Sequence, residues 1–271
     1  MRIPCRSQFF FLCSTLWIAS VSLPPLFAAD APATTKRSTE KMAAQKAASE
    51  DPLITNFHSL GEIDHRTNIY RSANPIGNIA DRLKGAEPTE ADRQQAKAQM
   101  QHLHDLGVRT VVSFQLQEPP TATTKNAEYN AVALEKAAAQ EVGIKYVAYP
   151  MANSGKGALS LQYMADEDVL KIVDAASSDI VKCSETGGVL FHCQSGKDRT
   201  GMVAGYLRIK YQHWSVDDAL REMREKGHVW QKFLKPGNTF SWHEEHLRAM
   251  AKTVADSEAV KPDAESKKPA K

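Results

Sequence analysis

The chain has 271 residues, of which 42% are apolar, and its formal net charge is +2. The length suits one mid-sized domain with additional segments at its ends, and the composition is ordinary for a globular protein. The small net charge, and the lack of a Lys/Arg block beside aromatic residues, argue against a nucleic-acid-binding protein.

Residues 1–29 have the layout of a secretory signal peptide. Two arginines precede an apolar stretch over residues 9–23, and Ala28 and Ala29 supply small residues for cleavage. A retained membrane anchor is the alternative, but the stretch is short for a span and is followed directly by Pro24. We therefore expect cleavage after one of these alanines, a periplasmic or secreted protein, and no membrane span after cleavage.

Composition divides the remaining chain into three parts. Residues 30–54 are rich in Ala, Thr, Lys, Ser and Glu, which is typical of a flexible linker. Residues 256–271 have a similar composition with added Pro, and we predict a disordered tail there. Residues 55–255 alternate strand and helix patterns and form the predicted domain, which we expect to be monomeric.

Cap residues and hydrophobic periodicity locate the elements of this domain. Thr89 and Ser215 mark helix starts, and Gly107, Gly143 and Gly227 mark helix ends. We predict strands over residues 68–71, 108–114, 144–149 and 188–193, and helices over residues 89–106, 126–142, 166–179, 200–211, 216–226 and from 239 or 241 onward.

Strands that alternate with helices predict an α/β fold, in which helices flank a central, mainly parallel sheet. The strand over residues 188–193 is apolar throughout, which favours a central position with both faces buried. Ligands of such sheets bind beyond the carboxyl ends of the strands. We therefore expect a functional site directly after Phe191 and His192.

The segment from His192 to Gly201 reads HCQSGKDRTG, with five residues between Cys193 and Arg199. A tight loop that opens a helix turns its amides inward and forms an anion site, and Gly196 permits backbone geometry that a side chain would block. Arg199 adds a planar fork for two phosphate oxygens, and the same positive field lowers the pKa of the Cys193 thiol. This arrangement predicts covalent phosphoryl transfer through a phosphocysteine.

The motif resembles the signature of the protein tyrosine phosphatase superfamily, including the flanking His192 and Thr200. The stretches IYRSANP (residues 69–75) and WSVDDALREM (residues 214–223) also look like parts of compact dual-specificity-like and bacterial phosphatases. The resemblance covers about residues 55–230. It implies the three-layer sandwich of the cysteine phosphatases and hydrolysis of phosphate monoesters.

The resemblance also implies site roles. Cys193 would be the nucleophile, Arg199 the phosphate clamp, and His192 would orient the loop and tune the thiolate. Thr200 would donate a hydrogen bond to the sulfur and help it leave. The residues between nucleophile and clamp would bind the phosphate: Gln194, Ser195, Gly196, Lys197 and Asp198.

Two basic side chains in or near this motif, Arg71 and Lys197, each have two possible roles. Arg71 would brace the loop or an adjacent carboxylate, or it makes an ordinary core or surface pair. Lys197 would contact a second phosphate or an acidic group of the substrate, or it is a solvated charge.

The chain departs from the family at the general acid. Many relatives carry an Asp on a loop upstream of the cysteine, but the corresponding residues 150–160 contain neither Asp nor Glu. Asp198 is our candidate acid; the other reading is that it only pairs with Lys197 or with a neighbouring loop. Three further carboxylates are candidates if the fold brings them near: Asp64, Glu118 and Asp166.

Other residue patterns have ordinary explanations. A disulfide between Cys183 and Cys193 is not expected. Cys183 precedes the strand that ends at Cys193, and the length of this strand separates the two residues by more than about 10 Å. We therefore expect Cys183 to be a buried helix residue. No metal or cofactor is expected, since the histidines lack ligand spacing. Trp230 and Phe233, beside two lysines, either rim a substrate cleft or pack the C-terminal helices.

The predicted substrates are phosphorylated proteins of the phosphotyrosine or dual-specificity type. A phosphoinositide or inositol phosphate is the alternative. Two further classes stay open: a non-catalytic phosphate-binding module, and a rhodanese-like sulfurtransferase, which also uses a cysteine after a strand.

Overall fold

The computed structural model describes residues 51, 53–83, 86–118, 128–154, 157–234 and 236–259. The predicted signal peptide, most of the predicted linker and residues 260–271 lie outside this part of the chain. Within the described ranges, no helix is both long enough and apolar enough to cross a membrane.

A five-stranded sheet with the order β1-β2-β5-β3-β4 forms the centre of the molecule. The strands are β1 (His58–Ser59), β2 (Ile69–Ser72), β3 (Val108–Ser113), β4 (Lys145–Ala148) and β5 (Gly188–His192). Only β1 pairs antiparallel in this sheet, and the other neighbours pair in parallel. Strand β5 is buried along its whole length and lies in the middle, which confirms the prediction from its apolar sequence.

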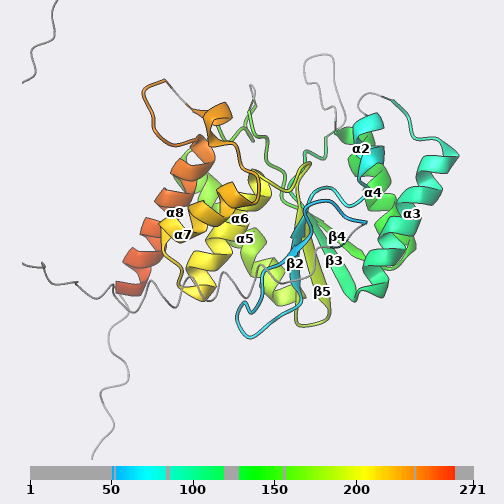
Figure 1. Ribbon diagram of the computed structural model, residues 1–271, viewed down its shortest axis with the longest axis horizontal. Helices are drawn as coiled ribbons and strands as arrows, with labels where there is room; N and C mark the ends of the chain where they lie inside the picture. The colour runs from blue at the N-terminus through cyan, green and yellow to red at the C-terminus, as the bar shows by residue number, and fades with distance from the viewer. Residues whose placement is uncertain are drawn as a thin grey trace, which may run out of the picture.

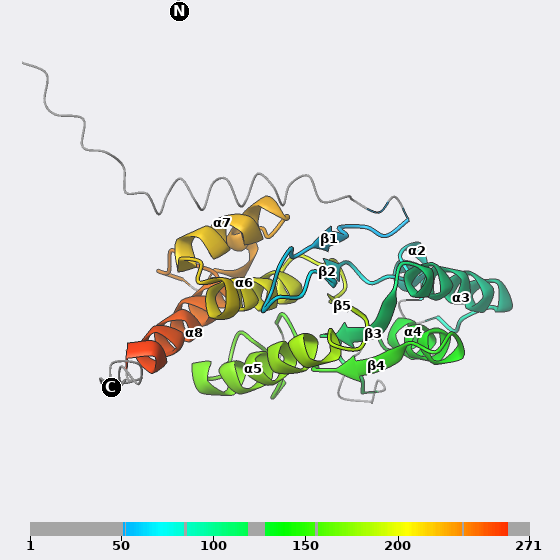
Figure 2. The same cartoon turned by 90° about the horizontal axis from the view of Figure 1, so that it is seen from below.

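Helices cover both faces of the sheet, so that the fold has three layers (Figures 1 and 2). One face carries α2 (Asn78–Arg82), α3 (Glu90–Asp105) and α4 (Tyr129–Glu141). The opposite side carries α5 (Asp166–Cys183), α6 (Arg199–Gln212), α7 (Val216–Glu225) and α8 (Trp242–Ala259), with the short 3-10 helix η1 (Trp230–Phe233) between the last two. The predicted α/β class and its mainly parallel sheet are confirmed.

Each face of the sheet has its own hydrophobic core, because successive strand residues point to opposite faces. Val112 and Phe191 pack under α5 and α6, whereas Val111 and Leu190 pack under α3 and α4. The sheet is therefore held between two apolar layers, and the loops at its carboxyl edge are fixed by rigid elements on both sides.

The helix ends follow the predicted capping residues. Thr89 and Asp92 form a reciprocal capping box at the start of α3, and Ser215 accepts a hydrogen bond from the amide of Asp218 at the start of α7. Gly107 follows α3 with a φ of +87°, a conformation that favours glycine.

Several elements differ from their predicted extent. Strand β1, helix α2 and η1 were not predicted, because they are too short to show hydrophobic periodicity. Helix α5 continues to Cys183, and α8 continues to Ala259, through residues 256–259 that we had assigned to the disordered tail.

Cys183 is the last residue of α5 and is only partly buried, so the prediction of a buried helix residue was wrong. Its Sγ lies 3.7 Å from Lys145 Nζ. Both Cys183 and Cys193 are free thiols.

Candidate active site

The loop of residues 193–199 joins β5 to α6 at the carboxyl edge of the sheet (Figure 1). Its central carbonyl oxygens, at residues 194–196, are held by neighbouring segments. Asn74 N donates to the first of them (3.1 Å), Arg71 Nη2 to the last (2.7 Å), and Asn56 Nδ2 to the second and third (3.3 and 3.0 Å). The amides of residues 194–198 donate to no acceptor within the described chain, so the loop can present them to an anion.

Gly196 is required at its position by two independent features. Its φ is +68°, in the left-handed region that side chains rarely adopt. A Cβ atom there would lie 2.4 Å from the carbonyl oxygen of Ser72 and 2.5 Å from the amide nitrogen of Ala73. The loop therefore packs directly on the backbone at the end of β2.

Cys193 is a buried thiol in a positive environment, with 1% of its surface exposed. Burial by itself raises the pKa of this thiol. The charge of Arg199 and the hydroxyl and amide of the nearby Thr200 outweigh burial, so that the pKa lies below that of an ordinary cysteine. The thiolate is thereby favoured, and it is the nucleophilic form.

His192 is fully buried, and each of its ring nitrogens faces an oxygen atom. Nδ1 lies 3.1 Å from the carbonyl oxygen of Cys193, and Nε2 lies 2.7 Å from Glu135 Oε1. Burial lowers the pKa of His192, but the Glu135 carboxylate outweighs this effect and holds the pKa above its usual value. Two facing acceptors suit the charged imidazolium, which adds a positive charge beside the thiolate.

A network of hydrogen bonds between polar side chains connects Glu135 to Gln194 of the loop. Asn74 Nδ2 donates to Glu135 Oε2 (3.1 Å) and to Gln115 Oε1 (2.7 Å), and Gln115 Nε2 donates to Gln194 Oε1 (2.8 Å). We did not predict Glu135 or Gln115 as site residues. A polar residue within an otherwise apolar helical face was the available signal for Glu135.

Arg199 is anchored but keeps unused donors. Nη1 donates to the carbonyl oxygens of Phe114 (3.2 Å) and Met151 (2.9 Å), and Nη2 donates to Glu128 Oε1 (3.2 Å). Of the five N–H groups of a guanidinium, Nε–H and one Nη2–H find no acceptor among the described residues. Burial lowers the pKa of Arg199, but the charges of Cys193 and Glu128 outweigh it, and the pKa is raised.

Arg71 braces the loop, as one of its two readings proposed. The residue is 1% exposed, and its guanidinium donates to the carbonyl oxygen of Gly196. Its charge faces Glu222, which also forms a buried ion pair with Arg208 at 2.7 Å. Burial lowers the pKa of Arg71, and the negative charges of Glu222 and Cys193 oppose this effect.

Among the candidate acids, Asp198 lies within the loop, and its carboxylate charge acts on Cys193. Its partners are His228 and Asn153 rather than Lys197: Oδ1 lies 2.6 Å from His228 Nδ1, and Asn153 Nδ2 donates to Oδ2 at 3.3 Å. Both partners lie in neighbouring loops, as the second reading of Asp198 allowed, but neither residue was predicted by number.

Two of the other candidate acids, Asp64 and Asp166, have a position or a partner outside the loop. Asp64 lies in the β1–β2 turn, before the start of β2 and thus at the opposite edge of the sheet. Asp166 pairs with His246 at 2.6 Å. Glu118 is exposed and follows β3. Glu128, which binds Arg199, is a carboxylate at the site that sequence reasoning missed.

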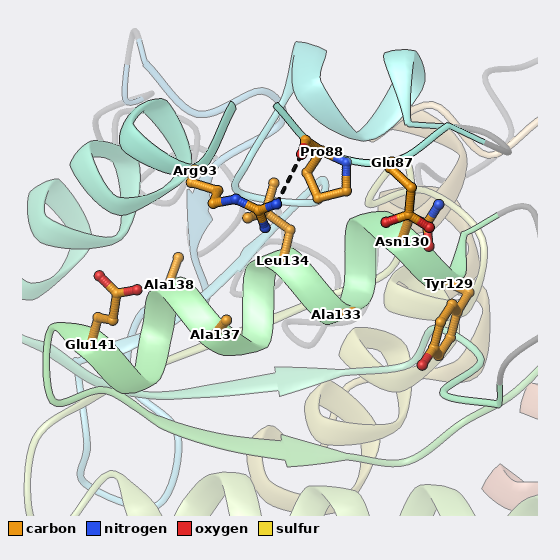
Figure 3. A pocket seen from close by; sticks show the side chains of 10 residues that line it. All are labelled: Glu87, Pro88, Arg93, Tyr129, Asn130, Ala133, Leu134, Ala137, Ala138 and Glu141. Atoms are coloured by element: carbon orange, nitrogen blue, oxygen red, sulfur yellow. Dashed lines mark hydrogen bonds between the residues drawn. The ribbon is translucent and has the colours of Figure 1, made fainter. Parts of the chain in front are cut away.

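Two further features lie outside the loop. Among the described residues, no group of three or more His, Cys, Asp or Glu side chains could hold a metal ion. A pocket of about 470 Å³ between Arg93 of α3 and Tyr129 and Glu141 of α4 (Figure 3) is lined by no residue of the loop, so it is separate from the loop.

Trp230 and Phe233 pack with the C-terminal helices. The Phe233 ring stacks on His228 with centroids 5.8 Å apart, and Arg224 lies over Trp230 at 5.4 Å. Phe233 therefore supports a residue that touches the loop.

The chain aligns with several solved structures over nearly the whole length of those structures. TpbA of P. aeruginosa shares 20% identity at a TM-score of 0.45, with 78% of this chain and 95% of that chain covered. The core catalytic domain of the PP-IP phosphatase SIW14 from S. cerevisiae shares 17% at 0.42, with 79% and 98% covered. A mouse putative dual specificity phosphatase shares 11% at 0.44, with 80% and 99% covered. At these identities the likeness concerns the fold alone.

A family model matches part of the sequence. A comparison with curated protein sequences gives no match. Residues 90–209 match the family model described as the tyrosine phosphatase family, and this segment contains β3, β5 and the complete loop of residues 193–199. Through residues 90–209 the chain is therefore similar to the tyrosine phosphatase family, and this similarity supports a phosphoric monoester hydrolase of the protein-tyrosine-phosphatase type.

Proposed function

We propose that the protein is an exported, cysteine-dependent phosphatase that hydrolyses phosphate monoesters through a phosphocysteine at Cys193. One observation carries the proposal: a thiol with a lowered pKa lies in a loop whose amides at residues 194–198, and whose Arg199, keep unused hydrogen-bond donors. A nucleophile and donors for a tetrahedral anion thus meet at one place. The export part of the proposal is supported by the signal-peptide pattern of residues 1–29.

In the first step, the Cys193 thiolate attacks phosphorus, an S–P bond forms, and the P–O bond to the leaving group breaks. Nε–H and the remaining Nη2–H of Arg199 hold two phosphate oxygens, and the loop amides hold the others. The leaving oxygen takes a proton from Asp198, the carboxyl group within the loop. His192 keeps its positive charge beside the thiolate and fixes the carbonyl of Cys193.

In the second step, water attacks the phosphocysteine, the S–P bond breaks, and inorganic phosphate leaves. Asp198 accepts the proton of that water. The departing sulfur is stabilised as a thiolate by Thr200 and Arg199, which are the groups that lower its pKa in the resting site. The same contacts therefore support attack in one step and departure in the other.

Phosphorylated proteins of the phosphotyrosine or dual-specificity type are the proposed substrates, with inositol phosphates or phosphoinositides as the alternative. Lys197 is exposed beside the loop, with its aliphatic stem against Gly227. Its ammonium group is free to contact a second anionic group, as both substrate classes can offer.

Phosphate release from phosphopeptides and phosphoinositides tests the proposal. We expect Cys193→Ser to lower kcat at least about a thousand-fold, and the wild type to form a covalent phosphoenzyme that is retained after quenching in denaturant. Cys183→Ser is the matched control and should leave kcat unchanged, since Cys183 lies at the end of α5 away from the loop. A wild type that releases no more phosphate than Cys193→Ser on every ester would refute the proposal, and thiosulfate sulfurtransfer in its place would indicate the rhodanese-like alternative.

A further inference from the structure

We propose that His228 is a positioning residue that holds Asp198 in the orientation needed for proton transfer. The inference rests on the proposed function. It assigns a role to the segment after α7, which lies outside the residues 90–209 that match the family model. The C-terminal part of the chain then completes the site.

The carboxyl group of Asp198 does not cap the helix that it precedes. Asp198 is the N-cap residue of α6, and an Asp at this position normally accepts a hydrogen bond from an amide of the first turn. Here its side chain makes no such bond. Both oxygens point instead to other segments of the chain, to His228 and Asn153.

The hydrogen bonds of His228 determine which ring nitrogen carries the proton. Ser241 Oγ accepts from the amide of Glu244 (3.3 Å) and lies 3.0 Å from His228 Nε2. A hydroxyl has a single proton to donate, and among its described neighbours Nε2 is the acceptor within reach. Nε2 therefore accepts, and Nδ1 carries the proton and donates to Asp198 Oδ1 at 2.6 Å.

The second oxygen of Asp198 is held more loosely. Asn153 Oδ1 lies 3.1 Å from His243 Nε2, which orients the amide so that its Nδ2 faces Asp198 Oδ2 at 3.3 Å. Burial holds the pKa of His243 well below its usual value, so its ring is neutral and donates through Nε2. Oδ1 is thus fixed by the short bond, and Oδ2 is the oxygen free to exchange a proton with the substrate.

The local backbone explains why His228 reaches this place. Gly227 ends α7 with a φ of +97°, and the amide of His228 returns to the carbonyl oxygen of Met223 (3.1 Å). This turn packs on the loop itself, because a Cβ on Gly227 would lie 3.0 Å from Lys197 Cε. Phe233 stacks parallel to the imidazole, at an interplanar angle of 3°, and restricts its rotation.

A pair of substitutions separates the two hydrogen bonds of the ring. In His228→Asn, the amide nitrogen takes the place of Nδ1 and retains the bond to Asp198. In His228→Gln, the longer amide takes the place of Nε2 and retains the bond to Ser241 alone. Both variants lose the ring, so a difference between them reports on the bond to Asp198.

Leaving-group dependence is the readout, because proton donation matters only for a poor leaving group. With phenyl phosphate, we expect kcat/KM of His228→Gln to fall at least about ten-fold and that of His228→Asn to stay within about three-fold of wild type. With p-nitrophenyl phosphate, whose leaving group departs as an anion, kcat/KM of both variants should stay within about three-fold. The ratio kcat/KM is the readout because it excludes hydrolysis of the phosphocysteine, which both substrates share. In an Asp198→Asn background, His228→Gln should cause no further loss.

Equal loss of kcat/KM on both substrates, equal loss of kcat/KM in both variants, or an additive loss in the Asp198→Asn background would each overturn the inference. His246→Gln is the control for a buried histidine of α8, because His246 bonds Asp166 and the carbonyl of Leu161 instead of the loop. It should leave kcat unchanged on both esters. A failure of the proposed function appears separately, as a wild type without Cys193-dependent phosphate release.

Discussion

At Cys193, one buried thiol is faced by three positive side chains from three elements: His192 of β5, Arg199 of α6 and Arg71 of β2. Burying a positive charge costs free energy unless a negative charge or hydrogen bonds compensate it. Here the carboxylates Glu135, Glu128 and Glu222 each accompany one of them. The site is therefore preorganised for an anion before any substrate arrives, and a small shift of the loop would disturb all of these contacts together.

Gly196→Ala tests how closely the loop depends on its contact with β2. The added Cβ would meet backbone atoms of Ser72 and Ala73, which cannot rotate away, so the loop must shift. A shift of about 1 Å in such a site lowers kcat/KM about a hundred-fold. We expect that loss, together with about 2 kcal/mol of destabilisation from the left-handed conformation and the contact.

Gly237→Ala is the matched control for this substitution. Gly237 has a φ of +85° but no atom within 4 Å of the added Cβ, so the backbone strain is similar and the contact is missing. It should lower the free energy of unfolding by about 1 kcal/mol and leave kcat/KM unchanged. Similar kinetics for both alanine variants would show that the contact with β2 does not shape the loop.

At the level of elements, β2, α6 and α7 are joined by buried charge. Arg208 of α6 forms a bidentate pair with Glu222 of α7, at 2.7 and 3.0 Å, and also lies 4.6 Å from the Trp214 ring centroid. Arg71 of β2 shares the charge of the same carboxylate. One glutamate thus compensates two buried arginines, one of which supports the loop.

Glu222→Gln should lower the free energy of unfolding by about 3 kcal/mol, because it leaves two buried arginines without their counter-charge. Burial raises the pKa of Glu222, but the two arginines outweigh burial and hold it below 4.5. A carboxylate whose pKa is lower in the folded than in the unfolded state stabilises the fold at pH values above its unfolded-state pKa. This stabilisation is lost as the pH falls through the folded-state pKa. Urea unfolding should therefore show a difference between wild type and variant that shrinks as the pH falls below 4.5.

Lys171→Gln is the control for an ion pair. It breaks an exposed pair with Asp168 on α5, whose side chains are 75% and 59% exposed. Such exposed pairs are screened by water and contribute little, so the variant should unfold nearly as the wild type does at every pH. A Glu222→Gln protein that unfolds like this control would show that the buried pair contributes little.

The elements also show what could be predicted from the sequence. Strand β5 and the adjoining loop are contiguous, so an apolar run followed by cysteine, glycine and arginine predicted both the central strand and the anion site. The supporting residues come from distant elements: Glu135 from α4, Asn153 from the β4–α5 connection and His228 from beyond α7. Hydrophobic periodicity predicts which face of a helix is buried, but not which buried polar group faces it across the core.

At the scale of the molecule, the folding unit extends beyond the residues that match the family model. Helix α8 lies outside that segment, yet its Trp242, Leu247 and Met250 belong to the core that α5 and α6 share with the sheet. Figure 2 shows α8 beside α6 and α5. The same helix begins directly after Ser241, the residue that fixes the tautomer of His228. Stability and site geometry thus depend on one C-terminal segment.

A chain that ends at residue 240 should not fold to the native state. Each of the three core side chains of α8 contributes about 2 kcal/mol when buried, so their loss removes about 6 kcal/mol, comparable to the total stability of a typical domain. A chain that ends at Ala259 retains both cores and should unfold within about 2 °C of the full-length protein. Circular dichroism and thermal unfolding of the two truncated chains measure this directly. Cooperative melting of the chain ending at residue 240, at the melting temperature of the full-length protein, would show that α8 is not needed for the fold. Any dependence of the loop on the C-terminal segment would then have to arise from residues 226–240.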